Sequence, residues 1–316
     1  MRKVKNIRVL VIVLLAAFLI QAGYVAYSMI GNSIFSNQTE EVASTDNLNN
    51  TTLLTSTTKL DSSADKTQIS NQAVNVDNQL KDETSLEISQ DVLDLIKKSD
   101  PDNYTKNVDN YKELLKSLNV HVIFKNQIER LIKSGKKLPD ILTAYAFLND
   151  CYGNMTDLEK LVKQKASGKN WVDIFMAYNK SNPEFVPRNF DSQYLEKLLG
   201  SPSIDQDDIM IADRVSQNTG VAIDTVINKR IEGLSWRLIN AQCGIVNGLE
   251  KSPHLSVTRN QLTKYTNQTK LSEKKVIEAL TIANKLSKSA DDVLKLVKQG
   301  LSKEEIYSKA YEEKYY

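Results

Sequence analysis

The sequence repeats one short pattern four times: a glycine, five variable residues and an isoleucine. The copies are Gly135–Ile141, Gly168–Ile174, Gly233–Ile239 and Gly300–Ile306. Successive glycines lie 33, 65 and 67 residues apart, which corresponds to one, two and two units of about 33 residues. This spacing is typical of arrays of helical hairpins, whose stacked helices form binding surfaces more often than catalytic clefts.

Each copy of the pattern predicts a helix, a tight turn and a second helix. Glycine closes the first helix at little steric cost, because it readily adopts the left-handed backbone conformation. Ser235 and Ser302 stand where the second helix needs an N-cap, and Glu305 completes a capping box in the last copy. The isoleucine then returns to the buried face, as Ile239 and Ile306 do in the last two copies. The turn glycines are Gly135, Gly168, Gly233 and Gly300.

The last two copies belong to a longer duplication. Residues 212–239 align without a gap with residues 279–306, and the matched positions share apolar residues, an aspartate and Gly-Leu-Ser. Agreement over such a length indicates duplicated helical units. Breaks are expected at 182–187 and 244–253, where Gly, Pro, Asn and Ser gather. We expect an all-α domain over residues 86–316, built as an array of helical hairpins with about ten to twelve helices in total.

The N-terminal residues predict a membrane anchor. Four cations lie in residues 1–8 and are followed by an apolar run over 9–30, long enough to span a bilayer as a helix. The first charges after the run are acidic, so residues 1–8 are expected in the cytoplasm and the C-terminal domain outside, in a single-pass protein of the cell membrane. Cleavage as a signal peptide near Ser28, with secretion, is the alternative.

Residues 31–85 predict a disordered tether. Ser, Thr, Asn and Gln make up 26 of the 49 residues between 36 and 84, and apolar residues are too sparse to offset the entropy of ordering this segment. That segment holds eight acidic residues and three lysines, residues 1–8 hold four cations, and the whole chain carries a net charge of +2. The net charge that remains for the folded domain is therefore close to neutral. A near-neutral domain lacks the basic footprint of nucleic-acid binding.

Two tryptophans occupy the same place in the pattern, three residues after the turn glycine. We interpret Trp171 and Trp236 as rings buried between paired helices. An exposed aromatic pair that contacts a glycan or peptide is the alternative. The corresponding positions of the other copies hold Leu138 and Lys303, so the position is not reserved for an aromatic ring.

No motif in the sequence indicates catalysis, a cofactor or a metal ion. His121 and His254 are the only histidines, and no zinc-binding, nucleophile-elbow or phosphate-loop spacing is present. The aspartate pairs 207–208 and 291–292 lie where helices are expected to begin, which favours a role at the helix dipole. The sequence around Trp236 also fits a helix-turn-helix motif with Arg237 in the second helix. That helix, however, is too apolar to recognise DNA bases.

Lysines and cysteines leave two further alternatives open. The lysines of the first repeat form either a solvated face or a site for anionic polymers or lipid headgroups; they are Lys133, Lys136, Lys137, Lys160, Lys163, Lys165 and Lys169. Cys151 and Cys243 are interpreted as two separate apolar side chains, although an outward-facing domain permits a disulfide.

The Gly-Leu-Ser-Trp phrase at 233–236, followed by Ile239, resembles uncharacterised membrane-anchored extracytoplasmic helical-repeat proteins of Clostridia-type Gram-positive bacteria. The resemblance covers roughly residues 125–316 and implies location and architecture, but no activity. The expected function is a membrane-tethered extracytoplasmic interaction or scaffold domain without catalysis, which binds a protein or cell-envelope partner and no nucleic acid. An envelope-associated enzyme or enzyme regulator is the alternative, and a helix-turn-helix DNA binder is a more distant one.

Overall fold

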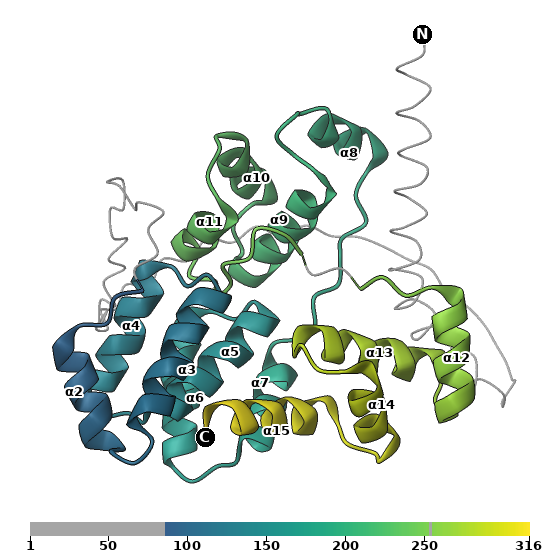
Figure 1. Cartoon of the computed structure of the whole chain (residues 1–316). Coiled ribbons are helices and arrows are strands. Elements are labelled where there is room, and N and C mark those ends of the chain that lie inside the picture. Colours follow the sequence, from purple (N-terminus) through teal and green to yellow (C-terminus); the bar gives the residue numbers. More distant parts are fainter. Residues whose placement is uncertain (1–85, 253–254) are drawn as a thin grey trace, which may run out of the picture. The chain divides into compact units, whose positions relative to one another are not determined.

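The computed structural model describes residues 86–252 and 255–316, and within these ranges the protein is all-α. It contains fourteen α-helices, α2 to α15, one short 3-10 helix and no β-strand, which confirms the predicted fold class (Figure 1). The number of helices exceeds the ten to twelve expected, because the turn glycines mark only four of the connections between them. The predicted cytoplasmic tip, membrane span and tether lie outside the described residues, as does His254. None of the described helices is long and apolar enough to cross a membrane.

The N-terminal part consists of two leading helices and a first helical unit, α4 to α7. The leading helices are α2 (Gln90–Ser99) and α3 (Tyr104–Ser117). The first unit comprises α4 (Val122–Lys133), α5 (Leu138–Cys151), the 3-10 helix η1 (Met155–Asp157), α6 (Leu158–Ala166) and α7 (Trp171–Ser181).

Two further units of four helices follow, and their helices begin in the same register. The second unit comprises α8 (Ser192–Leu199), α9 (Gln206–Thr219), α10 (Ile223–Ile231) and α11 (Trp236–Gln242). The third comprises α12 (Arg259–Thr269), α13 (Glu273–Lys285), α14 (Ala290–Lys298) and α15 (Lys303–Tyr315). Every helix of the third unit begins 67 residues after its counterpart in the second. The duplication therefore extends upstream of the alignable residues 212–239.

The first unit follows the same plan with one insertion. Helix α5 begins 68 residues before α9, whereas α6 and α7 begin 65 residues before α10 and α11. The connection between α5 and α6 is accordingly three residues longer, and this connection contains η1.

The apolar side chains of the described residues form two cores. One core is built from α2 to α7 and α12 to α15, with Ala241 of α11 and Val246, and the other from α8 to α11 with Tyr152 and Ile245. The C-terminal helix α15 packs against α3, α5 and α7, which precede it by well over 100 residues (Figure 1). The third unit therefore packs directly on the N-terminal helices and shares a core with them.

Candidate functional sites

The four turn glycines lie between consecutive helices in the left-handed conformation. Their φ angles are 78° at Gly135, 94° at Gly168, 91° at Gly233 and 89° at Gly300. A Cβ built on any of them would meet no atom within 4 Å, so the backbone conformation, rather than crowding, favours glycine there. Ser235 and Ser302 accept hydrogen bonds from amides of the next helix, and Glu305 completes the capping box. The pattern isoleucines Ile239 and Ile306 are buried.

Trp236 lies in the core of the second unit, inside a polar network. Its ring is fully buried, and its indole N–H donates to Asp208 Oδ1 at 2.6 Å. Asp208 also accepts from Arg230 Nε at 2.9 Å, and the Arg230 guanidinium lies 5.6 Å from the Trp236 ring centroid. Ile231, the last residue of α10, does not join this core, since its side chain is exposed.

Trp171 repeats this arrangement in the first unit. Its indole N–H donates at 3.1 Å to the hydroxyl of Tyr316, which in turn donates to Asp140. Asp140 and Asp208 are both the third residue of their helices, α5 and α9. Lys165, 65 residues before Arg230, lies 5.3 Å from the Trp171 ring centroid. Both tryptophans thus belong to buried packing networks, and neither ring is available to a ligand.

In the third unit the corresponding position holds Lys303, which forms an ion pair with Glu184 on the connection between α7 and α8. Position 275, which corresponds to Asp208, is an exposed lysine. The third unit therefore has neither the ring nor its carboxylate partner, and Lys303 contacts a segment distant in sequence instead.

The second helix of the Gly-Leu-Ser-Trp phrase does not present a DNA-reading surface. Helix α11 has only seven residues, and five of them are buried, Arg237 included. Arg237 Nη1 donates to Asn119 Oδ1 at 3.0 Å, while the carboxylate of Glu250 accepts from the amides of residues 236 and 237. This arginine is engaged within the protein and cannot read base edges in that position.

The remaining polar candidates also have local roles. His121 is the buried N-cap of α4, and the aspartate pairs 207–208 and 291–292 lie in the first turns of α9 and α14. Among the described residues, no group of three or more His, Cys, Asp or Glu side chains is placed to hold a metal ion. Both Cys151 and Cys243 are free thiols.

More than half of the seven lysines singled out in the first unit are paired with acidic side chains. Four of them form ion pairs: Lys133 with Asp91, Lys160 with Asp157, Lys163 with Glu159 and Lys165 with Glu312. The pairing divides the basic face into separate local contacts. It favours the solvated-face interpretation over a continuous site for an anionic polymer.

A polar junction forms where the C-terminal ends of α5, α9 and α13 meet. Lys285 Nζ donates to the Asp150 carbonyl at 3.1 Å, and Asn218 Nδ2 donates to the Tyr152 carbonyl at 2.9 Å. Asp150, Asn218 and Lys285 occupy corresponding positions near the ends of their helices, successively 68 and 67 residues apart. Cations at such ends offset the partial negative charge of the unpaired carbonyls.

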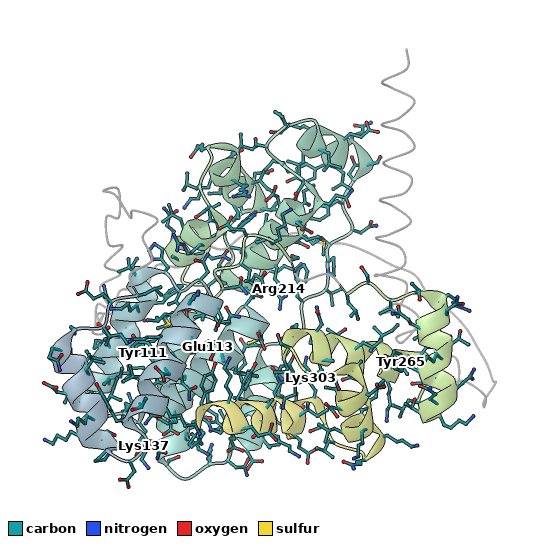
Figure 2. The ribbon with its side chains drawn as sticks, viewed as in Figure 1. Tyr111, Glu113, Lys137, Arg214, Tyr265 and Lys303 are labelled. Carbon is teal, nitrogen blue, oxygen red and sulfur yellow. The ribbon has the colours of Figure 1, made fainter. Side chains whose placement is uncertain are left out.

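Aromatic residues cover this junction. Tyr311 donates to the Asp150 carboxylate. Arg214, which projects from α9 and is labelled in Figure 2, lies 4.0 Å from the Tyr152 ring centroid. Burial raises the pKa of Asp150 and lowers the pKa values of Lys285 and Arg214, since it disfavours the charged form of each. One carboxylate and two cations thus lie within a packed contact between three units, where Lys285 and Asn218 bind carbonyls at the end of α5, and these contacts favour a structural role for the junction.

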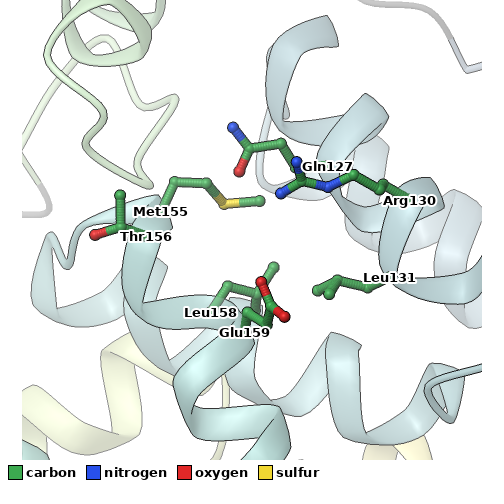
Figure 3. Close-up of a pocket in the computed structure, with 7 residues that line it drawn as sticks. All are labelled: Gln127, Arg130, Leu131, Met155, Thr156, Leu158 and Glu159. Carbon is green, nitrogen blue, oxygen red and sulfur yellow. The ribbon is translucent and has the colours of Figure 1, made fainter. Parts of the chain in front are cut away.

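A pocket opens on the first unit between α4 and the η1–α6 segment (Figure 3). Its volume is about 260 Å³. Buried apolar side chains line its floor, and polar side chains line its rim. The lining residues are Gln127, Arg130, Leu131, Met155, Thr156, Leu158 and Glu159.

The pocket rim carries both signs of charge. Arg130, on the exposed side of α4, forms no ion pair within the described part of the chain. Glu159, on α6, pairs with Lys163 at 2.8 Å across one helical turn. The pKa of Glu159 lies below its ordinary value, mainly because of the hydrogen bond from Lys163, with Arg130 and Lys136 adding to the effect. Glu159 is therefore ionised at neutral pH.

Sequence reasoning missed this pocket, because its residues come from three elements with no shared motif. Arg130 and Glu159 read as ordinary solvent-facing charges on amphipathic helices. The η1 insertion, visible as a three-residue difference in repeat length, was the available signal that the first unit departs from the others here.

In comparisons with known proteins, no family model, curated protein or solved structure matches this chain.

Proposed function

We propose that this protein is a membrane-tethered, extracytoplasmic interaction or scaffold domain without catalytic activity. The observation that supports an interaction domain is the matched register of the second and third helical units. Duplicated helical units present extended surfaces, and such surfaces suit protein or polymer partners. The repeat residues themselves, Trp171 and Trp236, are buried, so a partner would contact the outer helix faces.

The location in this proposal rests on the sequence. Cations in residues 1–8, an apolar run over 9–30 and a polar stretch over 31–85 together favour an N-terminal anchor followed by a tether. Residues 86–316 would then lie outside the cell, held near the membrane.

Protease treatment of intact cells tests the location. The full chain carries one epitope tag at each terminus, and trypsin should remove the C-terminal tag while the N-terminal tag stays protected. Protection of the C-terminal tag until the membrane is opened would contradict the proposed topology. Loss of residues 1–28 from the mature protein, measured by intact mass, would instead support secretion after cleavage.

Crosslinking in isolated cell envelopes tests the interaction. The full chain is compared with residues 1–85 alone, which retain the proposed anchor and tether. We expect saturable crosslinks that map to lysines within residues 86–316, such as the exposed Lys309. Equal crosslinking by residues 1–85, or crosslinks that do not saturate, would contradict a specific interaction domain.

A further inference from the structure

The pocket between α4 and η1–α6 combines an apolar floor with opposite charges on its rim. Leu131, Met155 and Leu158 are buried residues, no more than 5% exposed. Arg130 and Gln127 project from α4, and Glu159 projects from α6 towards the same opening (Figure 3). Concave sites with an apolar lining and a few converging polar groups are the usual form of small-ligand sites.

The size of the pocket limits its occupant. At about 260 Å³ it lies just below the roughly 300–1,000 Å³ typical of sites for drug-sized ligands. A nucleotide or an oligosaccharide is too large, whereas one aliphatic side chain with its charged groups is of suitable size.

The charges limit the occupant further. A guanidinium with no ion pair among the described residues offers a planar pair of N–H donors, which matches a carboxylate. Glu159 can accept from an ammonium group, because its existing pair with Lys163 is solvent-exposed and such pairs contribute little. The pocket thus complements a ligand that carries both a carboxylate and an ammonium beside an apolar group.

We propose that this pocket binds a free aliphatic α-amino acid, such as leucine. The carboxylate pairs with Arg130, the ammonium pairs with Glu159, and the side chain lies on the floor formed by Leu131, Met155 and Leu158. The Gln127 amide provides a further polar contact on the rim. The interior of a peptide lacks both charges, so it would satisfy only the floor. This site goes beyond the proposed partner binding and does not depend on it.

Isothermal titration calorimetry of the full chain in detergent with L-leucine tests the proposal. Arg130→Gln and Glu159→Gln each remove one charge, and Arg259→Gln is the matched control, since Arg259 is an exposed arginine on α12. We expect saturable binding to the wild type and the control. Each pocket variant should bind at least about tenfold more weakly, because a hydrogen-bonded charge pair is lost. Circular dichroism verifies that each variant is folded.

Several results would overturn the proposal. These are absence of saturable binding at about 10 mM leucine, a concentration about 10,000-fold above a Kd of about 1 μM, or equal affinity of Arg130→Gln and wild type. Binding of N-acetyl-leucine amide as tight as that of leucine would show that the charges are not recognised. Binding of a leucine-containing peptide without binding of free leucine would assign the pocket to a partner protein. The envelope crosslinking experiment remains independent of each result.

Discussion

Replacing each tryptophan by phenylalanine tests whether the hydrogen bonds of the two buried indoles contribute differently to the free energy of unfolding. Trp236→Phe and Trp171→Phe make the same chemical change at fully buried positions. They therefore share the cost of a smaller ring. They differ in the acceptor of the lost bond: the Asp208 carboxylate at 2.6 Å for Trp236, and the Tyr316 hydroxyl at 3.1 Å for Trp171.

The difference in unfolding free energy follows from these acceptors. A hydrogen bond to a charged group contributes about 1.5–3 kcal/mol, whereas a neutral one contributes about 0.5–1.5 kcal/mol. Asp208 keeps its bonds from Arg230 and from the Asp205 amide, which limits the loss. We therefore expect Trp236→Phe to cost about 1–2 kcal/mol more than Trp171→Phe. Trp236→Ala should cost about 3–5 kcal/mol, because it also leaves a cavity.

Urea unfolding of the full chain in detergent, followed by circular dichroism, measures these losses. The fluorescence of the remaining tryptophan reports on the other core in each variant. Asp208→Asn should lower stability on its own and should reduce the additional cost of Trp236→Phe, since the two residues share one bond. Equal losses for the two phenylalanine variants, or a larger loss at Trp171, would refute the role assigned to Asp208.

Three further outcomes are expected. Gly300→Ala should destabilise by about 1–2 kcal/mol in thermal unfolding, because an L-residue is strained at a φ of 89° even where space is open; no change would mean that the turn relaxes freely. Gly248→Ala should destabilise the protein more than Gly300→Ala, since its Cβ would lie 2.3 Å from the Asn119 carbonyl oxygen. A smaller loss of stability than at Gly300 would contradict this contact. Cys151 should be alkylated slowly at pH 8 in the folded protein and rapidly in urea, because burial raises its pKa to about 12 and leaves little thiolate; equal rates, measured by mass spectrometry, would show an open site.

The helix turns were predictable from sequence because they depend on local backbone chemistry. A glycine followed at the second position by a serine specifies a left-handed turn and an N-cap within four residues. Gly233 and Gly300, with Ser235 and Ser302, adopt this arrangement. The all-α class followed from the same periodic pattern, whereas the number of helices was underestimated because the pattern glycines mark only four of the connections between helices.

The contacts between helices that are not consecutive were not predictable, because no local sequence pattern links the residues that they join. The burial of Trp236 followed from its register, but its bond to Asp208 did not, since the same aspartate also fits a simple helix-dipole role. The junction of Lys285 with Asp150 likewise pairs residues from the first and third units. The pocket depends on the packing of α4 against a three-residue insertion, and a single sequence does not encode that relation in any local pattern.

The three units together show how a repeated position acquires different roles. In the first two units a buried ring reaches an aspartate near the start of an earlier helix, either directly or through Tyr316. In the third unit Lys303 occupies that position, and the position that corresponds to Asp208 holds the exposed Lys275. The lysine instead pairs with Glu184, which precedes the second unit. The ring and its carboxylate partner therefore occur together, because a buried indole N–H without an acceptor would be left unsatisfied.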